Sequence, residues 1–218
     1  MDIDETLVHS ELIIEQSREK PAINKKYDRR VEFRNPNGTV DVYGVRYRPF
    51  LLEFLDRMSK LYDLAIYTAS AKDYADAVID QLDPTKTLFI GRLYREHCRN
   101  ITGMNVKNML NFDGTDVFLV DNLIYSYALQ LDQGIPICPF IDDEMDVELK
   151  DLAEILENLP AFDSLQSLLQ DLFGLNQFYD KLELDGETSN IQVNAALLQH
   201  AAAAGLNERT AAGNALTF

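Results

Sequence analysis

The 218-residue sequence predicts an α/β domain, in which a parallel sheet is flanked by helices. Strand-like and helix-like segments alternate along the chain, and this order favours parallel strands joined by right-handed crossovers. A further feature is Asn37-Gly38, which stands between alternating β-forming residues and tolerates the positive φ of a tight turn. We therefore expect a small β-hairpin, at residues 31–48, inserted into the parallel plan.

The elements predicted after the hairpin form a helix–strand–helix series. Residues 48–62 carry apolar side chains at helical spacing, with Pro49 suited to the first turn. Residues 63–70, "DLAIYTAS", have the pattern of a short buried strand that ends in a Thr/Ser loop. Residues 72–82 follow as an amphipathic helix, which stops at Asp83-Pro84.

The rest of the chain continues this alternation and then loses it. The expected segments are a strand and loop at 87–98, a short helix at 105–112, buried strands at 116–122 and 134–140, and amphipathic helices at 146–159 and 162–173. We predict one domain over residues 1–173. Residues 174–218, rich in Ala and Asn, are expected to form a tail that is partly helical or disordered.

The charge of the chain is strongly uneven. The formal net charge is −16, and residues 101–218 hold 4 Lys/Arg against 19 Asp/Glu, whereas residues 1–100 hold 16 against 17. Such a chain repels a nucleic-acid backbone, so direct nucleic-acid binding is disfavoured, while a local set of arginines could still bind one phosphate group. No run of about 18 apolar residues is present, which predicts no membrane span within this chain.

Cysteine usage indicates a reducing compartment. Cys98 and Cys138 lie far apart without a C-x-x-C spacing, so a zinc site is not expected. We therefore expect a nuclear or cytoplasmic protein.

The segment that points to chemistry is "DIDET", where Asp2 and Asp4 are separated by one residue. Two carboxylates about 4 Å apart repel each other by roughly 4 kcal/mol at an effective dielectric constant near 20. A hard divalent cation with oxygen ligands is the usual means of offsetting that repulsion. The alternative interpretation is a solvated acidic N-terminus without a function.

Further polar residues follow in a definite order, mostly at predicted strand ends. Thr68 ends the strand at 63–70, Lys107 stands in "NVKN", and Asp121-Asn122 ends the strand at 116–122. This set resembles the haloacid dehalogenase superfamily of phosphotransferases. With "DIDETLVHS", "YTAS" and "YREHC" it is most similar to the small C-terminal-domain phosphatases and their Dullard-like relatives, over roughly residues 2–172. The resemblance implies a Rossmann-like parallel sheet.

The resemblance also implies a role for each matching residue. Asp2 matches the nucleophile that becomes an aspartyl-phosphate, and Asp4 matches the general acid and base. Thr68 and Lys107 match the groups that hold the phosphoryl oxygens. The implied cofactor is Mg²⁺, and the implied metal-binding residues are Asp2, Asp4 (through its carbonyl), Asn122 and Asp121, the last plausibly through water.

The same resemblance implies a phosphorylated protein or peptide as substrate. Arg95 matches an arginine that binds phosphate, Thr6 helps to fix the substrate-binding loop, and the 31–48 hairpin matches one wall of a peptide groove. Tyr74 matches a residue that lines this groove. Leu12 stands where the relatives often place an aromatic residue that receives a substrate proline.

Three departures from the family pattern stand out. Leu12 is smaller than the usual aromatic residue. The usual Asp-Asn-Ser-Pro is "DNLIYSY" here, beginning at Asp121, and the usual Tyr-Val-Lys-Asp is "NVKN" at 105–108. None of these changes removes a catalytic group.

The resemblance finally implies an apolar strand ahead of Asp2, for which this sequence has no residues. Burying an apolar side chain is worth roughly 1.5–3 kcal/mol, so four of them contribute roughly 6–12. That is comparable with a whole-domain stability of roughly 5–15 kcal/mol. We expect that the natural chain begins further upstream, and the alternative is that this product is a poorly stable, inactive fragment. The main hypothesis is a protein serine/threonine phosphatase, acting for example on the RNA polymerase II C-terminal domain, and the alternative is a catalytically impaired phosphopeptide-binding module. A small-metabolite phosphatase is a weaker third reading.

Overall fold

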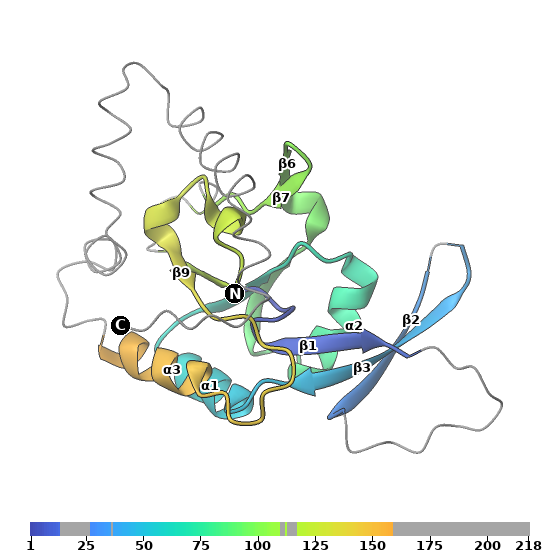
Figure 1. Ribbon diagram of the computed structural model, residues 1–218, viewed down its shortest axis with the longest axis horizontal. Helices are drawn as coiled ribbons and strands as arrows, with labels where there is room; N and C mark the ends of the chain where they lie inside the picture. The colour runs from blue at the N-terminus through green and yellow to red at the C-terminus, as the bar shows by residue number, and fades with distance from the viewer. Residues whose placement is uncertain (14–26, 36, 110–111, 113–116, 159–218) are drawn as a thin grey trace. The chain divides into compact units, whose positions relative to one another are not determined.

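A computed structural model of the protein describes residues 1–13, 27–35, 37–109, 112 and 117–158 (Figure 1). Its main chain divides into two compact units, each of which is described by itself. The first unit consists of the described residues within 1–96 and 140–157, and the second consists of the described residues within 97–139 together with Asn158. The predicted helix at 162–173 lies outside the described residues, as does the tail that follows it.

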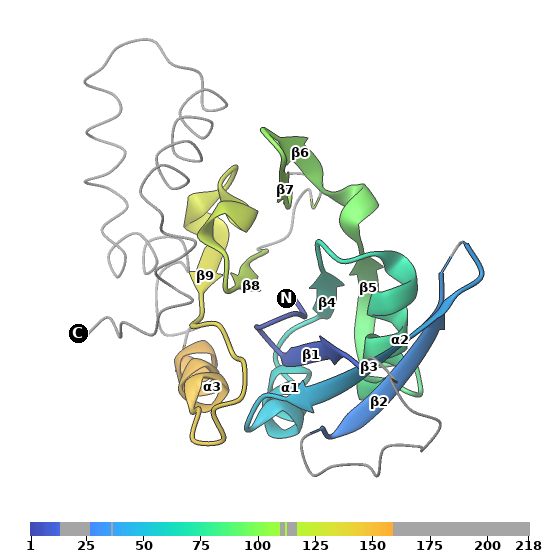
Figure 2. The ribbon, with the colours of Figure 1, turned by 45° about the vertical axis from the view of Figure 1, so that its right-hand side comes forward.

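The first unit contains the predicted parallel β–α–β arrangement. Strand β4 (Leu64–Tyr67) pairs in parallel with β5 (Phe89–Leu93), and helix α2 (Lys72–Leu82) connects them (Figure 2). The helix buries Ala75, Val78, Ile79 and Leu82, and it covers the residues predicted for it without a shift. The α/β class and the parallel pairing are therefore confirmed.

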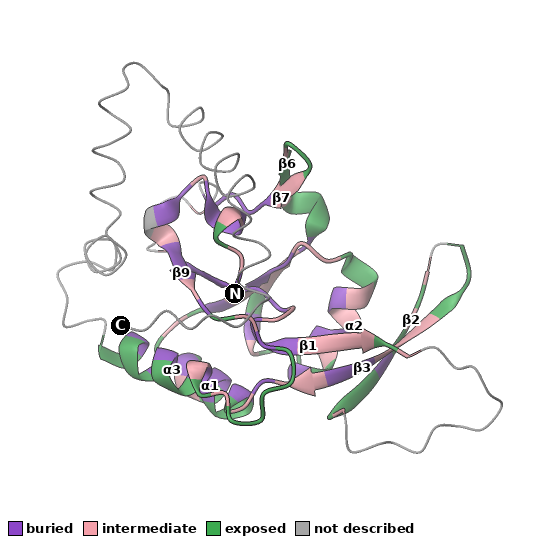
Figure 3. Cartoon of the chain, viewed as in Figure 1, coloured by how far each residue is buried: buried purple, intermediate pink, exposed green. Residues whose placement is uncertain are grey.

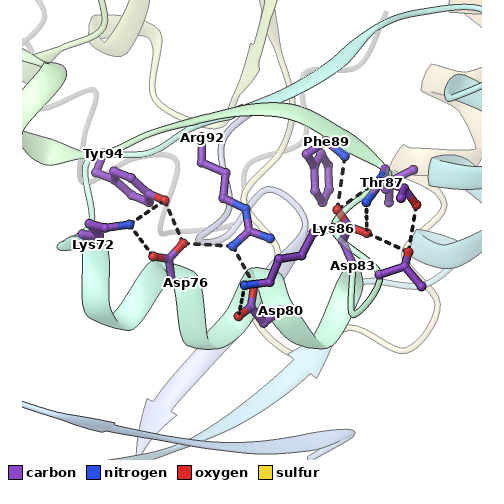
Figure 4. Close-up of polar contacts among 11 residues, drawn as sticks. Lys72, Asp76, Asp80, Asp83, Lys86, Thr87, Phe89, Arg92 and Tyr94 are labelled. Atoms are coloured by element: carbon purple, nitrogen blue, oxygen red, sulfur yellow. Dashed lines mark hydrogen bonds and ion pairs between the residues drawn. The ribbon is translucent and has the colours of Figure 1, made fainter.

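Hydrogen bonds and ion pairs link one side of α2 to β5 and to the residue that follows it (Figure 4). Asp76 accepts hydrogen bonds from Lys72 (2.6 Å), Arg92 (2.9 Å) and the hydroxyl of Tyr94 (2.7 Å), and Arg92 also donates to Asp80 (2.7 Å). Burial alone would raise the pKa of Asp76, but these donors outweigh it and lower that pKa below the ordinary value. The helix is thus held to the strand by charge-assisted bonds in addition to its apolar face.

Ahead of Asp2, the main chain of Met1 follows the edge of β4. The Met1 ammonium group donates to the carbonyl of Ala65 (2.7 Å), and the Tyr67 N–H donates to the carbonyl of Met1 (2.9 Å). Met1 therefore bonds to β4 through both its amino group and its carbonyl, as a residue of a neighbouring strand does. They place Asp2 beside the end of β4, where Thr68 follows.

An antiparallel sheet of three strands contains the predicted hairpin. Its order is β1 (Val8–Leu12), β3 (Val40–Tyr47), β2 (Arg29–Arg34). The β2–β3 loop has five residues, and among those that the structure describes Gly38 alone has a positive φ, of 87°. The hairpin prediction is confirmed, although its loop is longer than a two-residue turn. Strand β1, directly after the acid pair, was not predicted.

Two further helices complete the first unit. Helix α1 (Leu51–Met58) buries Leu51, Phe54, Leu55 and Met58, and helix α3 (Glu148–Asn158) buries Leu149, Leu152, Ala153 and Leu156. Figure 3 shows both helices buried on one side and exposed on the other. The prediction that Pro49 lies in the first helical turn was wrong, because the helix begins at Leu51, after Phe50 adopts a left-handed φ of 63°.

The second unit has its own short strands. A hairpin joins β6 (Arg99–Ile101) to β7 (Met104–Val106), and β8 (Leu119–Asp121) pairs in parallel with β9 (Gly134–Pro136). Three short 3₁₀ helices accompany them: η1 (Arg95–His97), which overlaps the end of the first unit, η2 (Ile124–Tyr127) and η3 (Leu131–Gln133).

The helix predicted at 105–112 is wrong for the residues described there. Residues 104–106 belong to β7, and residues 107–109 have no regular structure. The hairpin turn explains this difference, since Thr102 and Gly103 both have positive φ, of 52° and 89°, as a two-residue β-turn requires. In the part of the chain that the structure describes, no helix is both long and apolar enough to cross a membrane.

Candidate active site

The acid pair lies in a tight loop at the start of the first unit. Asp2 is buried and Asp4 is half-buried. The carbonyl of Ile3 accepts hydrogen bonds from the N–H groups of Leu7 (2.9 Å) and Val8 (3.1 Å). Glu5 takes a left-handed φ of 58°, which turns the chain between the second aspartate and the buried Thr6. These bonds therefore fix the main chain that carries both aspartates.

Two distant residues anchor this loop from outside. Arg48 donates from Nη1 to the carbonyl of Thr6 (3.0 Å), and the N–H of Phe140 donates to the carbonyl of Glu5 (2.8 Å). Arg48 also makes a two-pronged pair with Asp146, at 2.9 and 2.8 Å. The Arg48 side chain is fully buried. Its guanidinium thus ties the acidic loop to the segment that begins α3.

The carboxylate of Asp4 is held by two hydroxyl groups. The Tyr74 hydroxyl donates to Oδ1, and the Ser70 hydroxyl donates to Oδ2 at 2.6 Å. Burial raises the pKa of Tyr74 well above its ordinary value, and the Asp4 charge adds to this effect, so Tyr74 stays a donor at neutral pH. Tyr74 was predicted only as a groove-lining residue, and Ser70 was missed. Their separation of four residues, at the entry to a predicted helix, was the available signal.

Thr68 and Arg95 follow the neighbouring strands β4 and β5, and main-chain hydrogen bonds link the two segments. Thr68 is buried at the end of β4, where its N–H donates to the carbonyl of Leu93 (2.9 Å). Arg95 follows β5, and its N–H donates to the carbonyl of Ser70 (3.1 Å). Its Nε donates to the carbonyl of Ala69 (2.7 Å), while the side chain is exposed. A guanidinium held in this way has further donors that can bind an oxyanion.

The predicted groove wall is exposed on the three-stranded sheet. Leu12 lies opposite Tyr43 in the register and is 49% exposed. The Tyr43 ring stacks on Phe33 with ring centroids 5.8 Å apart, and both rings contact Tyr74. The hairpin and the residues predicted to line the groove therefore lie together in the first unit.

The second unit holds Lys107, Asp121 and Asn122, all of which are buried. The Lys107 ammonium bonds to Oδ2 of Asp121 at 2.5 Å, and the N–H of Leu123 donates to Oδ1 at 2.8 Å. Both oxygens of Asp121 therefore accept hydrogen bonds within this unit. Burial raises the pKa of Tyr127 nearby, and the Asp121 charge raises it further.

The predicted site residues thus fall into two sets, one in each unit. The first unit brings together the acid pair, Thr68, Tyr74 and Arg95, and the second brings together Lys107 with Asp121-Asn122. Among the residues that the structure describes, no three His, Cys, Asp or Glu side chains gather as a metal-binding cluster. The predicted ligand set is of another kind, because it includes a main-chain carbonyl and an amide.

A parallel α/β unit that presents a fixed Asp pair beside a strand-terminal threonine is a phosphatase domain of the haloacid dehalogenase type. Over residues 1–166 the chain matches the family described as NLI interacting factor-like phosphatase, and it belongs to this family. A phosphatase domain of this type implies a metal cofactor.

Named relatives agree with this assignment. The chain is 42% identical over 163 residues to "CTD small phosphatase-like protein 3" of Caenorhabditis elegans, covering 74% of this chain and 53% of the relative. It is 37% identical over 172 residues to the human "Carboxy-terminal domain RNA polymerase II polypeptide A small phosphatase 1", covering 78% and 62%. The chain therefore spans less than two thirds of the length of these relatives.

A solved structure shares the fold. The RNA polymerase II CTD phosphatase Fcp1 superposes with a TM-score of 0.53 at 24% identity, covering 87% of this chain and 54% of that one. A second Fcp1 structure, from fission yeast and bound to beryllium fluoride, also gives a TM-score of 0.53, at 22% identity. At these identities the likeness supports the α/β fold.

Proposed function

We propose that this domain is a magnesium-dependent protein serine/threonine phosphatase that acts through an aspartyl-phosphate. The observation that carries this proposal is the acidic loop, in which a buried Asp2 stands two residues before an Asp4 whose carboxylate is oriented by two hydroxyls. One carboxylate suited to attack and a second suited to proton transfer are the minimum that this chemistry needs.

The reaction proceeds in two displacements. A carboxylate oxygen of Asp2 attacks the phosphorus, the bond to the serine or threonine oxygen breaks, and Asp4 gives that oxygen a proton. Water then attacks the aspartyl-phosphate, Asp4 takes a proton from the water, and inorganic phosphate leaves with Asp2 restored. Thr68, Arg95 and Lys107 bind the phosphoryl oxygens while charge develops on them.

The residues assigned to the cofactor are suited to Mg²⁺, because all of them offer oxygen donors. Asp2, the carbonyl of Asp4 and Asn122 are the proposed direct ligands. Asp121 takes an outer position, since both of its oxygens already accept bonds from Lys107 and Leu123. The ion, when bound, neutralises charge on the phosphoryl group and on the acid pair.

We propose a phosphorylated protein as substrate, such as the RNA polymerase II C-terminal domain, for which the human relative is named. The exposed Leu12 and the aromatic rings of the hairpin offer an apolar wall for a peptide. The net charge of −16 argues against direct binding of nucleic acid. Cys98 and Cys138 lie far apart in the sequence without a C-x-x-C spacing, and this cysteine usage supports a nuclear or cytoplasmic location.

The test is hydrolysis of p-nitrophenyl phosphate and of a phosphoserine peptide with and without Mg²⁺. We expect turnover that requires the ion, and a loss of about 10³-fold or more in the Asp2→Asn variant. Asp63→Asn, the same change at an exposed aspartate, should retain activity. Phosphopeptide binding without turnover would contradict the proposal and would support a phosphopeptide-binding module instead.

A further inference from the structure

Asp4 has its two carboxylate oxygens bonded by side chains that flank the start of one helix. Ser70 lies just before α2 and Tyr74 lies in its first turn. Each donates a hydroxyl hydrogen bond to a different oxygen of Asp4. A carboxylate bonded at both oxygens has little freedom to rotate, so the direction of its lone pairs is set by the helix.

The Tyr74 hydroxyl is itself fixed by what its ring contacts. The ring meets Phe33 edge-on, with centroids 5.9 Å apart and an interplanar angle of 70°. It meets Tyr43 at 5.3 Å and 58°. Phe33 and Tyr43 lie on neighbouring strands of the hairpin. Aromatic pairs at these separations hold a defined geometry, so the hairpin restrains the Tyr74 ring. The Tyr74 hydroxyl in turn restrains the Asp4 carboxylate.

We propose that Tyr74, assisted by Ser70, is a positioning residue for proton transfer, which holds Asp4 in the orientation that protonates the leaving oxygen. This role differs from lining a peptide groove, because it acts on the reacting acid. It rests on the proposed function, in which Asp4 is the general acid. The aromatic contacts with the hairpin give Tyr74 the rigidity that this role requires.

The two roles of Tyr74 predict different responses to the leaving group. A residue that only binds peptide changes the rates of small aryl phosphates little, or changes all of them equally. A residue that orients the acid matters more when the leaving oxygen is more basic and needs the proton. Phenyl phosphate releases an ordinary phenol, of pKa about 10, whereas p-nitrophenyl phosphate releases a weaker base.

The experiment measures kcat/KM of the full chain with Mg²⁺ for both aryl phosphates. This parameter reports the steps up to departure of the leaving group, so hydrolysis of the aspartyl-phosphate does not mask the effect. In Tyr74→Phe we expect a loss of about 10-fold with phenyl phosphate and of about 2-fold or less with p-nitrophenyl phosphate. Equal losses with the two substrates would overturn the proposal.

Three further variants strengthen the test. Ser70→Ala should change the same ratio in the same direction, and the double variant should lose less than the product of the two single losses, because both hydroxyls act on one carboxylate. Phe33→Ala leaves both bonds to Asp4 in place but loosens the ring, and should shift the ratio by a smaller factor. An unchanged ratio in Ser70→Ala would count against the proposal.

The matched control is Tyr62→Phe. Its hydroxyl donates to the carbonyl of Leu156 at 2.6 Å, which links the end of α1 to α3. This change also deletes one tyrosine hydroxyl bond and should lower thermal stability without altering the substrate ratio. An inactive wild-type chain would refute the proposed function and this inference with it. An active chain whose ratio is unchanged in Tyr74→Phe would refute the inference alone.

Discussion

Asp83, at the scale of single residues, closes helix α2 and holds the turn into β5. Its Oδ1 accepts the N–H of Thr87 (3.0 Å), and its Oδ2 accepts those of Leu88 (3.1 Å) and Phe89 (3.3 Å), as Figure 4 shows in part. The side chain is 2% exposed. Burial alone would raise the pKa of Asp83, but the three main-chain donors outweigh it and hold that pKa below the ordinary value.

We predict that Asp83→Asn lowers the free energy of unfolding by about 1–3 kcal/mol at pH 7, since an amide cannot accept all three bonds. The pKa of Asp83 is lower in the folded state than in the unfolded state, where it lies near 4. The stabilisation is therefore complete above the pKa of the unfolded state. It is lost as pH falls through the folded pKa. The gap between wild type and variant should therefore be constant from pH 6 to 8 and shrink below about pH 4.

Urea unfolding at a series of pH values measures this gap. Asp63→Asn, at an exposed aspartate, provides the control and should change the free energy of unfolding by less than about 0.5 kcal/mol at any pH. A gap that grew as the solution became more acidic would contradict the assigned direction of the Asp83 pKa.

The positions of single residues in the fold were predictable from sequence only where the signal was local. Asp2, Asp4 and Thr68 could be placed because each stands beside a recognisable strand pattern or motif. The hydroxyl bonds from Ser70 and Tyr74 to Asp4 join residues 66 and 70 positions apart. The four-residue separation of Ser70 and Tyr74 indicates that they lie together at the entry to the helix. It does not identify Asp4 as their partner, because that depends on how β4 and α2 pack against the acidic loop.

At the scale of elements, the Arg48–Asp146 pair connects three parts of the first unit. It joins the end of β3, the acidic loop and the start of α3, where Asp146 also accepts the N–H of Glu148 (3.0 Å). A second pair with the same two-pronged geometry joins Arg57 to Glu157 on α1 and α3. The pairs differ in exposure, since the Arg48 and Asp146 side chains are 0% and 10% exposed and those of Arg57 and Glu157 are 24% and 38% exposed.

We predict that Arg48→Met lowers the free energy of unfolding by about 3–5 kcal/mol, because it leaves the Asp146 charge buried without its partner. The matched change Arg57→Met should lower the free energy of unfolding much less, since water solvates the remaining carboxylate. Chemical denaturation of the two variants measures the difference. Equal losses of unfolding free energy in the two variants would show that burial does not determine how much these pairs stabilise the protein.

Helices and strands were predictable where apolar residues recur regularly along one face. Helix α2 and strands β4, β8 and β9 fall within their predicted segments for this reason. The prediction of a helix at 105–112 was wrong because three to four apolar residues fit a helix or a strand equally well. The Thr102-Gly103 turn favours a strand at the start of this segment. Strand β1 could not be recognised from the local sequence, because its residues pair with the distant β3, from Val8 with Tyr47 to Leu12 with Tyr43.

At the scale of the whole molecule, the dominant physical feature is charge. The chain carries 36 acidic against 20 basic residues, and the excess lies almost entirely beyond residue 100. Self-repulsion of this size opposes compaction, and salt screens it, with a Debye length of about 10 Å at 0.1 M. Salt also weakens surface ion pairs such as Lys60–Asp56, but exposed pairs contribute only about 0–1 kcal/mol each.

We predict that the melting temperature rises by about 2–5 °C between 20 and 300 mM NaCl, because relief of the repulsion exceeds the loss of exposed ion pairs. Thermal unfolding followed by circular dichroism measures this change. A neutral osmolyte at matched osmolality separates screening from a general solvent effect, and it should reproduce little of the rise. A melting temperature that fell with NaCl would mean that the pairs within the folded units, including the α2–β5 cluster around Asp76, outweigh the net charge. The sign of the salt effect thus decides whether the distribution of charges or their sum governs the stability of this domain.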